Sequence, residues 1–219
     1  MRRAVKSTIF TILFLVLSGS TALFAYLYFF QPGERNLSGV WTAELDMSSQ
    51  AAAAAFGWLW DIEGISVSLE EVGAYMEDLT IQVNLTFEQT DRWEGTFRCF
   101  TEAESYDACN EAAYEAFAMA FQELLAERLR MAGYEGGTDR ESMEALVNQA
   151  FGMSTASYLK ACGPALLPSL EEMQERYDGN GTYTARDGIL TRVYDGGHPV
   201  AAREERYIRK GGSLILSEE

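Results

Sequence analysis

The sequence predicts an α+β protein with an N-terminal transmembrane helix, followed by an antiparallel meander or barrel of about seven strands that a helical insertion interrupts. Three observations lead to this prediction. Residues 8–30 form an uncharged, mostly apolar stretch that is long enough to cross a bilayer as a helix. Residues 37–101 and 179–216 contain segments in which apolar and polar side chains alternate, as they do in half-buried strands. Residues 105–177 carry apolar side chains at helical spacing instead.

The apolar stretch at 8–30 reads TIFTILFLVLSGSTALFAYLYFF. Arg2, Arg3 and Lys6 precede it, and no acidic residue does. The positive-inside rule therefore predicts that residues 1–7 lie in the cytoplasm and that the rest of the chain lies outside the cell membrane. We expect a single-pass membrane protein.

A cleaved secretory signal would share this basic start, but its apolar core is only about 7 to 15 residues long. Here the apolar run continues to Phe30. The sequence therefore favours an uncleaved signal anchor over a cleaved signal. A short polar linker at 31–36 then leads to a single extracytoplasmic domain at 37–219, with the helical insertion at about 105–177.

The formal net charge is −16, from 33 acidic and 17 basic residues. Such a negative field disfavours nucleic acid as a partner and attracts cations or basic partners. The acids are scattered along the chain rather than collected in blocks. We therefore interpret most of them as a solvated surface that resists aggregation.

The first half of the domain predicts a strand, two helices and a hairpin. Residues 37–45 alternate as a strand, and the alanine-rich residues 49–64 favour a helix. Ser68 and Glu71 have the spacing of a capping box, which predicts a short helix over 68–77. Residues 78–89 and 93–101 then alternate strictly and predict an antiparallel hairpin.

The second half predicts helices and then a further meander. Within the helical insertion, Thr138 and Glu141 again have capping-box spacing. Two hairpins follow, one turning at Asp187-Gly188 and one at Gly211-Gly212. The prediction is thus three strands before the helical insertion and four after it.

The segment LSGVW contains a Gly-x-Trp pattern, Gly39 and Trp41, at the start of the first predicted strand. Together with the terminal segments GTYTARDGILTRV and RYIRKGGSLIL, it resembles the lipocalin-like domains of small bacterial membrane-anchored proteins. The resemblance covers about half of the domain. It implies a β-barrel that Trp41 closes at one end, and the carriage of a small apolar molecule.

We find no pattern that predicts catalysis, a cofactor or a metal site. The single histidine, His198, lies in a Gly-Gly-His-Pro turn, which favours a surface position. The cysteines are three in number, so at least one thiol has no intramolecular partner. Cys109 and Cys162 are candidates for a disulfide between two helices, and the alternative is that all three cysteines are small buried residues.

If the domain encloses a ligand pocket, we expect Trp41, Trp93, Phe97 and Tyr183 to line it, although aromatic residues more often belong to the core. The sequence therefore predicts a non-enzymatic binding or structural module that binds a small apolar ligand or an envelope partner. The alternatives are an accessory subunit of a membrane complex and a carboxylate-based hydrolase.

Overall fold

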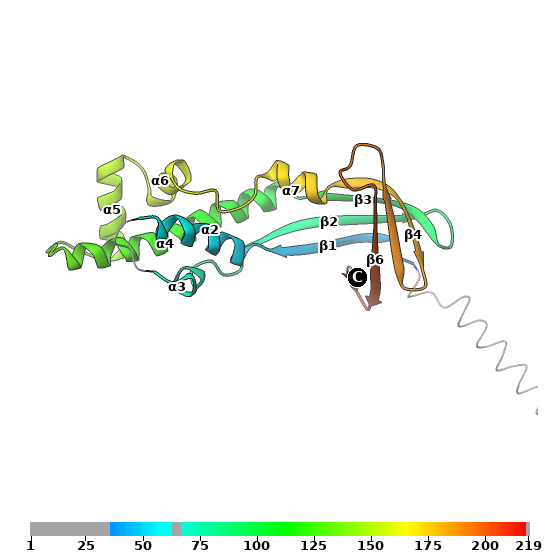
Figure 1. The fold of residues 1–219 in the computed structure, drawn as a ribbon, viewed down its shortest axis with the longest axis horizontal. Helices are drawn as coiled ribbons and strands as arrows, with labels where there is room; N and C mark the ends of the chain where they lie inside the picture. Colours follow the sequence, from blue (N-terminus) through cyan, green and yellow to red (C-terminus); the bar gives the residue numbers. More distant parts are fainter. Residues whose placement is uncertain (1–35, 63–66, 218–219) are drawn as a thin grey trace, which may run out of the picture.

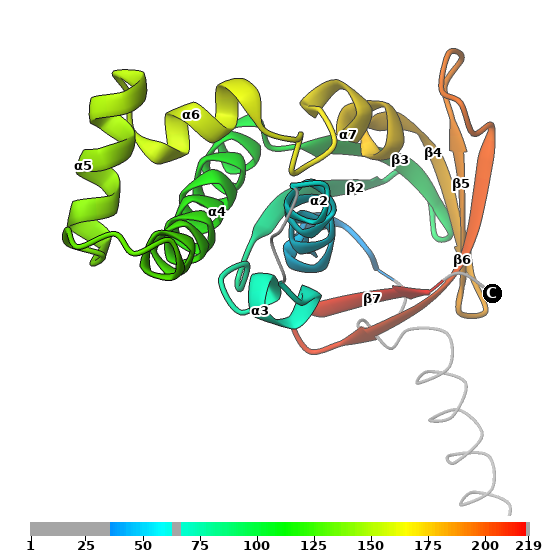
Figure 2. The same ribbon diagram turned by 60° about the vertical axis from the view of Figure 1, so that its left-hand side comes forward.

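One antiparallel sheet contains seven strands, each paired with its neighbours in the sequence. The computed structural model describes residues 36–62 and 67–217. The strands are β1 (Gly39–Asp46), β2 (Thr80–Gln89), β3 (Glu94–Thr101), β4 (Gly179–Arg186), β5 (Ile189–Tyr194), β6 (Ala202–Lys210) and β7 (Ser213–Ser217). The sheet curls into a nearly closed barrel (Figure 2). The predicted meander, with three strands before the helical insertion and four after it, is confirmed.

Residues 1–35, 63–66 and 218–219 are not among the described residues. The predicted anchor at 8–30 and most of the predicted linker fall there. Within the two described ranges, no helix has both the length and the apolar character that crossing a bilayer requires.

The strands form where the sequence alternates. In β2, the side chains on one face of the strand are buried, and those between them are more exposed. The buried set is Ile81, Val83, Leu85 and Phe87. The turn between β4 and β5 uses Asp187 and Gly188 with φ angles of 54° and 81°, the positive values that a two-residue hairpin turn needs.

The helices join two of the strand pairs. Helices α2 (Ser48–Trp60) and α3 (Leu69–Gly73) connect β1 to β2, whereas α4 (Ala103–Met131), α5 (Arg140–Phe151), α6 (Thr155–Cys162) and α7 (Leu170–Tyr177) connect β3 to β4. We call α2 to α7 the helical unit. Because neighbouring strands run in opposite directions, both connections leave the barrel at the same end. Figure 1 shows the helical unit on the left and the barrel on the right.

The two ends of the barrel therefore differ. The helical end carries the helical unit and the loop between β5 and β6. The opposite end, which we call the tight-turn end, carries the short connections β2–β3, β4–β5 and β6–β7. The first described residue, Asn36, lies at the tight-turn end because β1 starts there and runs toward the helical end (Figure 1).

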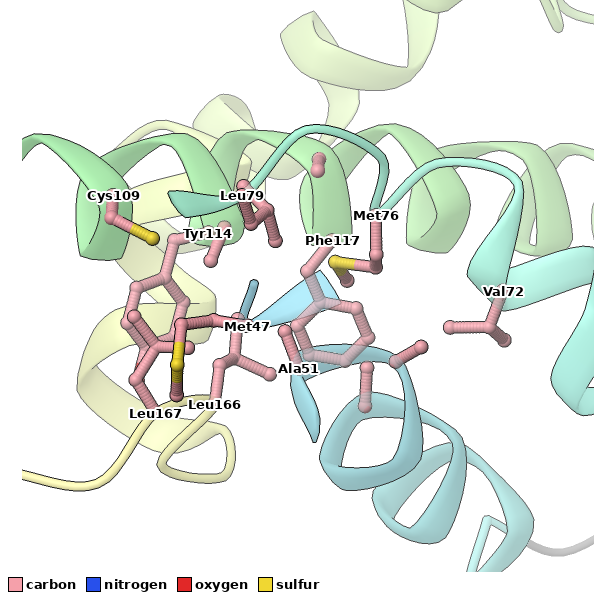
Figure 3. Packing of buried hydrophobic residues seen from close by; sticks show 14 of the residues in the cluster. Met47, Ala51, Val72, Met76, Leu79, Cys109, Tyr114, Phe117, Leu166 and Leu167 are labelled. Atoms are coloured by element: carbon pink, nitrogen blue, oxygen red, sulfur yellow. The ribbon is translucent and has the colours of Figure 1, made fainter. Parts of the chain in front are cut away.

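Each part has its own core. The barrel core is built from alternating strand residues, and the core of the helical unit surrounds Phe117 of α4, which is fully buried. Figure 3 shows Phe117 between Met76 and Ala51, and the ring of Trp58 meets it edge to face at 5.7 Å. These contacts hold α2 and the segment after α3 against α4.

Two helix starts test the capping predictions. The Ser68 hydroxyl accepts a hydrogen bond from the Glu71 amide, and the Glu71 carboxylate accepts one from the Ser68 amide, so the capping box of α3 is confirmed. The prediction that Thr138 caps α5 is wrong. Asp139 is the N-cap, and its carboxylate accepts a hydrogen bond of 3.0 Å from the Ser142 amide.

Candidate functional site

The four aromatic residues expected to line a pocket lie in two places. Phe97 and Tyr183 are buried in the barrel core, and Trp41 packs against the same core from β1. Trp93 precedes β3 at the tight-turn end, with the Arg92 guanidinium 5.1 Å from the centre of its ring. None of the four lines the two grooves described below.

Aromatic rings fill the part of the barrel around Phe97 and Tyr183. The Phe87 ring lies 4.8 Å from that of Tyr183 and 6.5 Å from that of Phe97, measured between ring centres. The Tyr194 ring meets Phe97 at 5.1 Å, edge to face. At these separations the rings are in contact, so they form packed core rather than the wall of an open space.

Trp41 of β1 contacts β6 across the tight-turn end of the barrel. Its indole N–H donates a hydrogen bond of 2.9 Å to the carbonyl of Leu37, and the Arg209 guanidinium of β6 lies 5.5 Å from the centre of its ring. Arg209 also donates a hydrogen bond to the carbonyl of Asn36. Gly39, the other member of the Gly-x-Trp pattern, has a φ of 135°, a value that favours glycine.

An ion pair lies buried on the inner face of the barrel. One oxygen of the Glu205 carboxylate accepts hydrogen bonds from Nη2 and Nε of Arg192, at 2.6 Å and 3.0 Å. Arg192 is 4% exposed and Glu205 is 6% exposed. The rings of Phe97 and Tyr194 lie 5.6 Å and 5.8 Å from the guanidinium. The sequence prediction missed this pair, although Arg192 alternates with the inward residues Leu190 and Tyr194.

Cys99, the buried cysteine of β3, is not set up as a nucleophile. Burial raises the pKa of its thiol from 9.0 to about 11, more than the nearby Arg192 lowers it. A thiol reacts through its thiolate form, which is scarce at neutral pH when the pKa is so high. Burial likewise raises the pKa of Tyr194.

His198 lies half-buried in a groove at the helical end, in keeping with the expected surface position. Its ring stacks on that of Tyr194, with the centres 3.9 Å apart, and its Nδ1 accepts a hydrogen bond from the Val200 amide. Gly179 permits this stacking, because a side chain there would collide with the Tyr194 ring. Nearby, Asp178 lines the same groove, whose volume is about 490 Å³.

A larger groove, of about 930 Å³, lies between α4, α5 and α6. We call it the α4–α6 groove. Its lining includes Glu115, Gln122, Arg140, Glu141, Glu144 and Asn148. At its base, Gln122 donates hydrogen bonds to the Glu144 carboxylate and to the Thr155 hydroxyl, and Thr155 donates to Glu144 from its amide and its hydroxyl. Thus one polar network joins three helices.

The cysteines are free thiols in the structure, so the candidate bridge between Cys109 and Cys162 is not formed, and the alternative of three buried cysteines fails at Cys162, which is exposed. The physical reason is their placement. Cys109 points into the core of the helical unit, whereas Cys162 ends α6 with its side chain exposed.

No protein-family model, curated protein or solved structure matches the chain. The nearly closed barrel is compatible with the lipocalin-like fold that Gly39 and Trp41 imply. Any function must therefore be argued from the geometry of the domain itself.

Proposed function

We propose that the protein is a membrane-anchored, extracytoplasmic binding module of lipocalin-like architecture, in which the barrel is the structural base and the helical unit engages an envelope partner. In this proposal the N-terminal segment holds the tight-turn end close to the membrane. The helical unit then points away from the membrane, where a partner can reach it.

The observation that carries the proposal is the position of the α4–α6 groove. Helices α4, α5 and α6 line it, and α5 and α6 lie at the end of the domain opposite the start of β1 (Figure 1). The linker before Asn36 is only a few residues long, which restricts how far the tight-turn end can move from an anchored helix. The groove is therefore an accessible concave surface in an anchored molecule.

The packing of the barrel supports a structural role for it. Carriage of an apolar molecule inside the barrel would require the contacting rings of Phe87, Phe97, Tyr183 and Tyr194 to separate. It would also bring an apolar ligand beside the Arg192–Glu205 pair. A partner that binds at the helical unit requires neither change.

Orientation can be tested with a native thiol. Cys162 is exposed, whereas Cys99 and Cys109 are buried. We expect a membrane-impermeant maleimide to label the full chain in intact cells and to leave a Cys162→Ser variant unlabelled. Labelling that occurs only after the cells are opened would overturn the extracytoplasmic placement.

Engagement of a partner can be tested by position-dependent photo-crosslinking in cells that express the full chain. A photoreactive residue is placed at Gln149 on α5, which lines the α4–α6 groove, or at the exposed Thr184 on β4 as a matched barrel control. We expect a discrete crosslinked product from Gln149 and none from Thr184. Products from Thr184 alone, or from neither position, would contradict the proposed function.

A further inference from the structure

We propose that the α4–α6 groove is a recognition site for a positively charged nitrogen group, an alkylammonium or guanidinium, as presented by the lysine and arginine side chains of a basic polypeptide. This inference rests on the proposed role of the helical unit as the binding part of the molecule. It adds the chemistry of the ligand.

One hydrogen-bond acceptor beside the groove has no partner in the described part of the chain. Gln122 is 4% exposed, and its side-chain oxygen, Oε1, is buried without a hydrogen-bond partner in the described part of the chain. Gln122 also lines the groove. Buried polar atoms are nearly always hydrogen-bonded, so a donor that reaches Oε1 from the groove when the lining side chains move apart would satisfy it.

The orientation of the Gln122 amide is fixed by its neighbours. Its Nε2 donates to Oε2 of Glu144 at 2.5 Å and to the Thr155 hydroxyl at 2.9 Å. Turning the amide over would place its oxygen against the Glu144 carboxylate, an acceptor against an acceptor. The Thr155 hydroxyl cannot donate to Oε1 either, because its one hydrogen is already donated to Glu144 at 2.7 Å. Oε1 is therefore the unpaired acceptor of this network, which an entering donor would satisfy.

The charge around the groove selects the kind of donor. Glu115, Glu141 and Glu144 line it, with Arg140 as the one cationic residue among the lining side chains. Hydrogen bonds from a charged nitrogen to a carboxylate are stronger than those between neutral groups. A ligand that donates to Gln122 beside Glu144 is thus favoured when it carries positive charge.

The test measures binding of a fluorescein-labelled hexapeptide of alternating lysine and serine to the full chain in detergent, by fluorescence anisotropy at about 150 mM salt. At this salt concentration charges more than about 8 Å apart are largely screened, which suppresses general attraction to an acidic protein. The same peptide with every lysine acetylated is the ligand control. Spermidine, added as a competitor, distinguishes a small polyamine from a polypeptide source.

Two variants address the groove, and one serves as a control. Glu144→Gln removes the charge and keeps one of the two oxygens that accept from Gln122 and Thr155. Ala145→Trp fills the groove from an exposed position on α5 and leaves the residues of the network unsubstituted. Glu204→Gln makes the same charge change on the exposed face of β6. We expect a roughly tenfold or greater rise in the dissociation constant for the two groove variants and less than a twofold change for Glu204→Gln.

Each outcome bears on the proposal. Binding of the lysine peptide that is lost on acetylation and weakened in both groove variants supports it, and competition by micromolar spermidine would assign the site to small amines. Equal weakening by Glu204→Gln, or no binding of either probe, would overturn it. If Gln149 still forms crosslinks in cells while the groove variants bind the peptide normally, the ligand chemistry fails and the proposed function stands.

Discussion

The buried Arg192–Glu205 pair allows a sharp test of how the barrel is stabilised. We expect Glu205→Gln to destabilise the protein strongly, because it leaves the Arg192 guanidinium charged and buried. Removing one partner of a buried ion pair costs about 3–5 kcal/mol. Both hydrogen bonds of Arg192 end on the same Glu205 oxygen, so a single substitution removes the carboxylate that pairs with the guanidinium.

The assay is urea unfolding of the full chain, followed by circular dichroism. With a slope of about 2.5 kcal/mol per M, a loss of about 3–5 kcal/mol moves the midpoint down by about 1–2 M. Glu204→Gln is the matched control, because this neighbour on β6 is exposed and we expect its midpoint to shift by less than about 0.2 M.

A double variant separates the charge from the packing. Replacing both partners by apolar residues of similar size, Arg192→Met with Glu205→Leu, removes the uncompensated charge. We therefore expect the double variant to be more stable than the Glu205→Gln single variant. A midpoint for Glu205→Gln within about 0.3 M of the wild type, or a double variant less stable than the single, would refute the reasoning.

Three further predictions concern other parts of the domain. Because the pKa of Cys99 is raised from 9.0 to about 11, the folded state keeps a proton that the unfolded chain releases, so stability falls as pH rises through this window. Urea midpoints across the window should fall less steeply for Cys99→Ala, and parallel curves would contradict this. Gly181→Ala should cost about 1–3 kcal/mol, because its Cβ would lie 2.0 Å from the Val193 carbonyl oxygen, whereas Gly196→Ala, with open space around it, should leave the midpoint unchanged. Phe117→Ala should cost about 3–5 kcal/mol by opening a cavity between α4 and its neighbours, and a melting temperature equal to that of the wild type would exclude this role.

The strands were predictable because each one is encoded locally. The alternation from Ile81 to Phe87 places one set of side chains on the buried face of β2, and Asp187-Gly188 supplies the backbone angles of the turn between β4 and β5. Such signals need only neighbouring residues. The prediction that Thr138 caps α5 was wrong for an equally local reason. The adjacent Asp139 offers a charged acceptor, which is also favoured at the positive end of the helix.

The candidate site was not predictable in the same way. Gln122, Glu144 and Thr155 come from three helices, and nothing in their spacing along the chain indicates that their side chains meet. The Arg192–Glu205 pair joins two strands. The alternation along each strand predicts that each residue faces inward, but it does not predict that the two side chains pair. The thiol of Cys109 faces the helical core because of how α4 packs, which sequence spacing does not specify.

The long connection between β3 and β4 affects the order in which the parts of the domain fold. The Thr101 amide donates a hydrogen bond of 2.5 Å to the Asp178 carboxylate, closing a loop of 77 positions where the helical unit leaves and rejoins the barrel. Closure entropy grows only with the logarithm of loop length, yet non-local pairing of this kind slows folding. A helical unit that folds early brings the two ends of the loop together. We therefore expect the helices to form first during synthesis, and the first hairpin to wait, with one edge of β3 unpaired, until the C-terminal strands arrive.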